Sequence, residues 1–143
     1  MVTVDGQSMA PTLPRGTVVL TEACAGASVR VGDVVVFQGD RGLTVHRVVH
    51  ATGRGPRSRL FHVGDALGGV GIGRVADVVA RAAAVLSPGD GPIPGVAEMP
   101  WRWRLRFADL RLRCRLAAWA DAATGGRFRQ ASFARWAWRR LLG

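Results

Sequence analysis

The stretch that decides the fold covers residues 33–50, and it reads DVVVFQGDRGLTVHRVVH. Two runs rich in β-branched residues, 33–38 and 43–50, flank a segment with glycines at positions 39 and 42. Glycine-containing turns between such runs are typical of antiparallel strands that form a hairpin. The sequence therefore predicts a β-hairpin near the middle of the first hundred residues.

Further strand-like runs lie on both sides of this hairpin. Residues 17–21 follow a Pro-Arg-Gly turn, residues 59–63 precede Gly64, and a Val/Ala-rich run over residues 73–86 fits either a strand or a helix. Short strands at this spacing, with glycine-rich turns between them, are typical of compact β-domains. We therefore predict a mostly β fold, a compact antiparallel domain over residues 1–87.

The remainder of the chain differs in composition. Residues 88–99 are rich in Pro and Gly, which oppose both helix and central strand, so we expect a linker there. Residues 1–99 hold nine arginines against eight acidic residues, whereas residues 100–143 hold eleven arginines against Asp109 and Asp121. All five tryptophans also lie within residues 100–143. This segment is predicted to be a separate, basic, Trp/Arg-rich extension.

The extension combines two periodicities. Residues 101–107 and 110–116 alternate between apolar side chains and arginine, which indicates a strand, but the alanines that follow and the propensities of Arg and Leu favour a helix. A helix would have one apolar face with Trp101, Leu105, Leu112, Leu116 and Trp119, and an opposite face with Trp103, Phe107, Leu110 and Cys114. After a glycine break at residues 125–126, a second helical face is predicted from Phe133, Ala134, Ala137, Trp138, Leu141 and Leu142.

Composition excludes several kinds of mechanism. The chain has 143 residues and a formal charge of +10, and all 20 of its basic residues are arginines. Any catalytic step that needs a lysine is therefore excluded. Cys24 and Cys114 show no zinc-ligand spacing, so we expect free thiols, no metal and no cofactor. The sequence shows neither a signal peptide nor a transmembrane run, which predicts a cytoplasmic location or a peripheral one on the inner membrane face.

The candidate nucleophile is Ser8, in the stretch DGQSMAPTL over residues 5–13. Gly6 permits a close approach of another backbone, and Pro11 restrains the chain just past the serine. Met9 and Leu13 are placed to pack beneath the turn and hold it rigid. A serine is a weak nucleophile unless a neighbouring group removes its proton, so the assignment depends on finding a base.

Three later segments follow Ser8 in a distinctive order, and they are residues 32–37 (GDVVVF), residues 45–49 (VHRVV) and the Gly64-Asp65 pair. Together with residues 6–13 this set resembles the signal peptidase I superfamily, which also contains the SOS-repressor-type autoproteases. The resemblance covers about residues 3–86. It implies a signal-peptidase-like β-domain and a serine endopeptidase that removes a leader or signal segment from a peptide or protein.

The resemblance also implies the base. Most bacterial members of the superfamily use lysine, whereas the endoplasmic-reticulum and archaeal type uses histidine in a Val-His-Arg-Val context, as around His46. A chain without lysine can follow only the histidine version. A neutral imidazole accepts a proton near pH 7 without the burial that a lysine needs, because the ordinary pKa of histidine is about 6.5.

A third group would orient His46. By resemblance this group is Asp65, and Asp33 and Asp5 are the alternatives. Gly6 and Met9 are assigned to the substrate and oxyanion side of Ser8. Gly6 stands where many members carry a serine that helps to bind the oxyanion, and the late box around Asp65 is shorter than usual. We expect the two other histidines to lie outside the reacting pair, His50 facing solvent and His62 in a structural role.

The expected partner is a peptide or protein substrate, whose extended chain adds to an exposed sheet edge near the site. For residues 100–143 three alternatives stay open: an anionic membrane surface, packing on the domain or on a partner, and nucleic acid as the least favoured. A second function also stays open, in which the chain is a catalytically silent relative that binds peptides or membranes.

Overall fold

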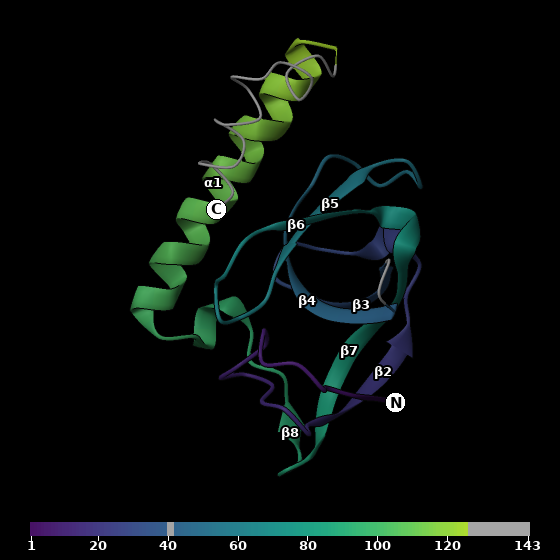
Figure 1. Ribbon diagram of the computed structural model, residues 1–143, viewed down its shortest axis with the longest axis vertical. Coiled ribbons are helices and arrows are strands. Elements are labelled where there is room, and N and C mark those ends of the chain that lie inside the picture. Colours follow the sequence, from purple (N-terminus) through teal and green to yellow (C-terminus); the bar gives the residue numbers. More distant parts are fainter. Residues whose placement is uncertain (40–41, 126–143) are drawn as a thin grey trace.

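The computed structural model describes residues 1–39 and 42–125. Within this part the strands are β1 (Val2–Thr3), β2 (Val18–Ala23), β3 (Val34–Gly39), β4 (Gly42–Ala51), β5 (Arg59–Val63), β6 (Gly71–Arg74), β7 (Val78–Ser87) and β8 (Gly91–Pro92). The helical elements are three short 3₁₀ turns, η1 (Gly26–Ser28), η2 (Val75–Asp77) and η3 (Val96–Glu98), and one long helix, α1 (Trp101–Ala123). Figure 1 shows α1 lying along one side of the β-domain.

The strands form one antiparallel sheet in the order β1-β2-β7-β3-β4-β5-β6, with β8 paired to β7. The central hairpin is present as predicted, because β3 and β4 pair with Val36 opposite Val45. The predicted fold class, a mostly antiparallel β-domain followed by a helical extension, is confirmed. The fold brings the N-terminal residues and the first residues of β4 into one region of the molecule.

The Val/Ala-rich run over residues 73–86 is divided by the turn η2. Its first residues belong to β6, and the rest form β7, which pairs with β2 on one edge and β3 on the other. Pairing on both edges overrides the helix propensity of its alanines, since tertiary contacts outweigh this weak preference. The Pro/Gly segment over residues 88–99 contains β8 and η3.

Three apolar clusters make up the core. One cluster, beneath the Ser8 turn, contains Val4, Met9, Leu13, Val19 and Val34. A second lies between β3, β4, β5 and the start of β7. The third is shared between α1 and the sheet, where Trp103, Phe107, Leu110 and Cys114 pack on a group that includes Val49, Phe61 and Val63.

Helix α1 confirms the two faces predicted from the sequence. The face with Trp103 and Phe107 is buried, and these two rings stack at a centroid distance of 5.0 Å. The opposite apolar face remains exposed. No helix in residues 1–39 and 42–125 is long and apolar enough to cross a membrane. The second predicted helical face, over residues 133–142, lies outside the described residues.

The two cysteines are free, as predicted. Cys114 is buried on the inner face of α1, and burial raises the pKa of its thiol to about 12. Cys24 is half-buried and lies 3.2 Å from the Ser28 hydroxyl. The Cys114 thiol therefore stays protonated at neutral pH.

Candidate active site

A rigid turn presents Ser8 at the surface. The Ala10 N–H donates to the Gln7 carbonyl at 3.0 Å, and the Leu13 N–H donates to the Met9 carbonyl at 2.8 Å. The side chains of Met9 and Leu13 are fully buried, as their positions in the sequence predicted. This arrangement leaves Ser8 exposed on a loop whose two neighbouring apolar residues belong to the core.

The Gly64 segment holds the Ser8 backbone from the other side. The Ala66 N–H donates to the Ser8 carbonyl at 2.9 Å. A Cβ atom added to Gly64 would lie 2.1 Å from that same carbonyl oxygen, a separation that non-bonded atoms do not reach. Glycine at this position is therefore required for the contact that fixes the Ser8 turn.

Ser8 and His46 meet although 38 positions separate them in the chain. His46 lies on β4 opposite Val35 of β3, and its Nε2 atom is 3.0 Å from the Ser8 Oγ atom. This is an ordinary hydrogen-bond distance between a hydroxyl and an imidazole. The geometry is that of a nucleophile beside a base, which is the arrangement needed to remove the serine proton.

The second nitrogen of His46 faces another histidine. His46 Nδ1 and His62 Nδ1 are 2.9 Å apart, and His62 is only 6% exposed. If the Ser8 hydroxyl donates to His46 Nε2, the proton of His46 is on Nδ1, and the lone pair of His62 Nδ1 accepts it. We assign these tautomers from the hydrogen-bond network. His62, expected to be structural, is thus the residue that contacts the imidazole.

The hairpin register explains this contact. His62 on β5 lies opposite Val48 of β4, so it is the diagonal neighbour of His46 on the same face of the sheet. A bulge between Val48 and His50 shifts the pairing by one residue. The sequence contains both histidines, but the loop length and the bulge hide their relative position.

Burial keeps both imidazoles neutral. Removal from water and, to a smaller extent, the nearby His46 together lower the pKa of His62 to about 4. Burial also lowers the pKa of His46, an effect that the negative charge of Asp65 opposes. The Phe37 ring packs on His62 at a centroid distance of 4.2 Å. Gly71 leaves room for the imidazole, because a Cβ there would lie 2.1 Å from the His62 Cε1 atom.

Asp65 does not make the contact expected of it. Its two oxygens accept hydrogen bonds from Arg47, at 2.8 Å from Nε and 2.7 Å from Nη2, and both side chains are about 1% exposed or less. Arg47 follows His46 on β4, and successive side chains of a strand point to opposite faces. The bidentate pair therefore engages Asp65 on the far side of the strand from the Ser8–His46 contact.

Neither alternative acid is a hydrogen-bond partner of His46 in the part of the chain that the structure describes. Asp33 accepts a hydrogen bond from the Arg30 N–H at 2.9 Å, as expected of a turn residue. Asp5 is exposed at the mouth of the cleft described below. Among the described residues, His62 is the one whose side chain contacts His46 Nδ1. His50 was expected to face solvent, but it is half-buried and its ring packs against Phe61.

A cleft of about 680 Å³ opens beside Ser8. Residues 1–6, Ser8 and Met9 line one side, and residues 43–45 of β4 line the other, so Gly6 and Met9 both border it. β5 pairs with β4 only from Arg47 to Ala51. The Val48 N–H points to β3, where it donates to Asp33, and backbone groups alternate along a strand. The backbone groups of Leu43 and Val45 therefore face away from β3, along the cleft.

Helix α1 connects to this region through Trp103. Its indole N–H donates to the Asp65 carbonyl at 2.8 Å, and the Arg47 guanidinium lies 5.6 Å from the centre of the Trp103 ring. Asp65 precedes Ala66, whose N–H holds the Ser8 carbonyl. The described residues contain no cluster of three or more His, Cys, Asp or Glu side chains that could hold a metal ion.

Comparison with known protein families gives one match. Residues 1–60 match the family described as Peptidase S24-like. The matched segment includes Ser8 and His46 and ends before His62 and Asp65. It supports the S24/S26 superfamily of serine peptidases and a peptidase-like fold for this β-domain. Comparisons with curated proteins and with solved structures gave no significant match.

Proposed function

We propose that this chain is a serine endopeptidase in which Ser8 is the nucleophile and His46 is the general base. The observation that supports the proposal most strongly is the 3.0 Å separation of Ser8 Oγ and His46 Nε2. Two residues 38 positions apart, both within the family match, come together on a rigid scaffold at the edge of a cleft. A chain without lysine has only this histidine version of the reaction available.

The reaction proceeds by acyl transfer. His46 Nε2 removes the Ser8 hydroxyl proton as Oγ attacks the carbonyl carbon of the substrate, and a tetrahedral oxyanion forms. The protonated imidazole then gives its proton to the leaving amine, and the peptide bond breaks. Water, deprotonated by the same imidazole, hydrolyses the Ser8 ester and releases the second product. General-base assistance of this kind contributes roughly 10²- to 10⁴-fold.

His62 acts as a positioning residue in this scheme. A neutral His62 accepts the Nδ1 proton of His46, so it fixes the ring orientation and leaves the Nε2 lone pair directed at Ser8. The low pKa of His62, about 4, keeps its acceptor lone pair available throughout the neutral range. Unlike a carboxylate, a neutral imidazole adds no negative charge to stabilise protonated His46.

The cleft supports an extended peptide as substrate. The free edge of β4 at Leu43 and Val45 offers backbone donors and acceptors to a substrate strand, which pairs with it and carries its scissile bond towards Ser8. The resemblance to signal peptidases adds that the substrate is a leader or signal segment with a small residue at the cleavage position. The Ser8 backbone N–H, close to Gly6, is the proposed oxyanion donor.

A mixture of peptides prepared by digesting a whole proteome tests the proposal without a known substrate. The wild-type chain should generate new amino termini, identified by mass spectrometry, that share a residue preference before the cut. Ser8→Ala and His46→Ala should each abolish these cuts while circular dichroism shows an unchanged fold.

A variant with a change far from Ser8 serves as the control for this cleavage assay. Arg54→Gln, an exposed change in the loop between β4 and β5, should leave cleavage unchanged. A correctly folded wild-type chain that cuts no peptide would contradict the proposal and favour the silent, peptide-binding alternative. Cuts that persist in Ser8→Ala would assign them to a contaminating protease.

A further inference from the structure

The outer face of α1 is an exposed apolar surface. Its members are Trp101, Leu105, Leu112, Leu116 and Trp119, and they are 51–71% exposed. The inner face is already occupied by the core, so this outer face contributes nothing to the packing of the described domain. Large apolar side chains clustered on one face of a helix mark an interaction surface more often than scattered ones do.

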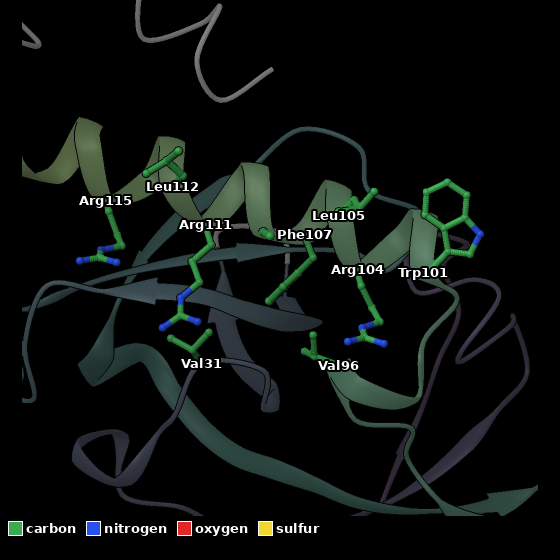
Figure 2. A pocket seen from close by; sticks show the side chains of 10 residues that line it. Val31, Val96, Trp101, Arg104, Leu105, Phe107, Arg111, Leu112 and Arg115 are labelled. Atoms are coloured by element: carbon green, nitrogen blue, oxygen red, sulfur yellow. The ribbon is translucent and has the colours of Figure 1, made fainter.

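Arginines flank the outer face on both sides. Arg102, Arg106 and Arg113 follow one flank, and Arg104, Arg111 and Arg115 follow the other. Figure 2 shows the side chains of this second set extending from α1 towards Val31 and Val96, while Leu105 and Leu112 lie on the other side of the helix. These three arginines, together with Val31 and Val96, line a groove of about 700 Å³ between α1 and the β-domain.

The positive charge of this groove is not neutralised within the described residues. Among the ion pairs formed by the described residues (1–39 and 42–125), none involves Arg104, Arg111 or Arg115. The nearest acidic neighbours on α1 are engaged, because Asp109 pairs with Arg113 and Asp121 pairs with Arg59. Burial lowers the pKa of His50, and the charges of Arg115 and Arg111 lower it as well, which indicates a positive potential on this side of the domain.

The positive charge and the apolar side chains of α1 together discriminate between the possible partners of its outer face. A second copy of α1 would bring arginines against arginines, and residues 126–143 carry five arginines and no acidic residue, so both would meet like charge. A nucleic acid would satisfy the arginines but leave the leucine and tryptophan side chains without an apolar partner. An anionic bilayer provides phosphate groups for the arginines and an apolar interior for the face between them.

We propose that α1 docks the chain on an anionic membrane surface, with its outer apolar face inserted among the lipids and its flanking arginines on the headgroups. The helix has 23 residues and would extend about 34 Å along the membrane plane. Docking needs no unfolding, because the inner face keeps its contacts with the β-domain. This inference concerns binding alone and does not depend on catalysis.

Vesicle binding by the full chain tests the proposal. Protein is mixed with phosphatidylcholine vesicles that contain either no anionic lipid or about one third phosphatidylglycerol, and binding is measured by flotation. Binding should require the anionic lipid. Arg111→Gln/Arg115→Gln should weaken it about 10- to 30-fold, and Leu112→Gln/Leu116→Gln at least tenfold. Ser8→Ala should bind like wild type, which separates this test from that of catalysis.

Matched controls use exposed residues far from α1 in the chain. Arg54→Gln/Arg57→Gln removes the same charge, and Leu20→Gln/Leu86→Gln removes two leucines that are also partly exposed (43% and 37%), so neither should reduce binding more than twofold. Equal loss in the α1 and control variants would overturn the proposal, as would unchanged binding in the leucine variant. Vesicle-independent dimers, or a short DNA duplex bound without dependence on Leu112 and Leu116, would also overturn it.

Discussion

At the scale of residues, the proposed chemistry depends on the contact between the imidazoles of His46 and His62. In serine hydrolases a carboxylate commonly orients the histidine and stabilises its charged form. Here His62 takes the orienting place, and the carboxylate of Asp65 is bound to Arg47. The imidazole of His46 is therefore oriented by a neutral partner in a partly buried setting.

This setting gives a first prediction on pH. Burial lowers the pKa of His46, and the base must be neutral to accept the Ser8 proton. Activity should therefore persist as the pH falls below 6.5 and decline only at the lowered pKa. The pH dependence of the rate of serine labelling by a fluorophosphonate measures this decline. A midpoint above 6.5 would instead indicate a carboxylate partner for His46.

A second prediction concerns His62 itself. His62→Leu removes the acceptor for the Nδ1 proton and should lower the labelling rate about 10- to 100-fold. His62→Gln keeps an acceptor oxygen near that position and should recover part of the loss. Equal rates in the two variants would assign His62 a purely structural role.

The same residue predicts an acid-dependent loss of stability. The unfolded chain binds a proton on this imidazole with a pKa near 6.5, whereas the folded chain does so only at about 4. Folding is favoured while the His62 imidazole is neutral. This stabilisation is therefore fully present above pH 6.5 and is lost as the pH falls towards 4. The change corresponds to roughly 3 kcal/mol of unfolding free energy.

Urea unfolding of wild type and His62→Leu between pH 6.5 and pH 4 measures how the free energy of unfolding of each protein depends on pH. The wild-type chain should lose more stability than the variant between pH 6.5 and 4, because the variant lacks the titrating group. Parallel pH profiles for the two proteins would exclude this contribution of His62.

Gly64 supplies a further prediction at residue scale. Gly64→Ala places a Cβ against the Ser8 carbonyl and must displace the Ser8 turn. A displacement near 1 Å should reduce the labelling rate about 100-fold. Gly68→Ala, later in the same loop, meets no atom within 4 Å and should label like wild type. A fully active Gly64→Ala variant would show that the close contact does not position Ser8.

At the scale of elements, α1 is part of the support of the site as well as a cover for the core. Trp103→Phe keeps most of the apolar area but leaves the buried Asp65 carbonyl without its indole donor. An unpaired buried carbonyl costs about 1–3 kcal/mol, which for a chain of this length corresponds to a fall in Tm of roughly 3–10 °C. Trp101→Phe, on the exposed face, should leave Tm unchanged. Thermal unfolding of both variants tests the contrast.

The elements also show what local sequence can and cannot predict. The hairpin of β3 and β4 and the two faces of α1 follow from periodicities that need no distant contact, so they were predictable. The His46–His62 contact and the Arg47–Asp65 pair depend on the register between β4 and β5, which a seven-residue loop and a bulge determine. No local pattern reveals that register.

At the scale of the whole molecule, the cleft and the outer face of α1 are separate surfaces joined by one series of contacts. Trp103 contacts Asp65, the next residue binds the Ser8 carbonyl, and Ser8 faces His46. The β-domain thus carries the proposed chemistry, and α1 carries the proposed attachment. The pairing of Ser8 with His46 came from the resemblance of their segments to the signal peptidase I superfamily, whereas the distance between the two side chains required the fold.

The most direct measurement is the site and rate of fluorophosphonate labelling, followed by peptide mapping. We predict a single adduct on Ser8, which should form roughly 10³-fold or more slowly in His46→Ala. An adduct on another serine, or equal labelling of Ser8 in His46→Ala and wild type, would contradict the claim that these two side chains act together.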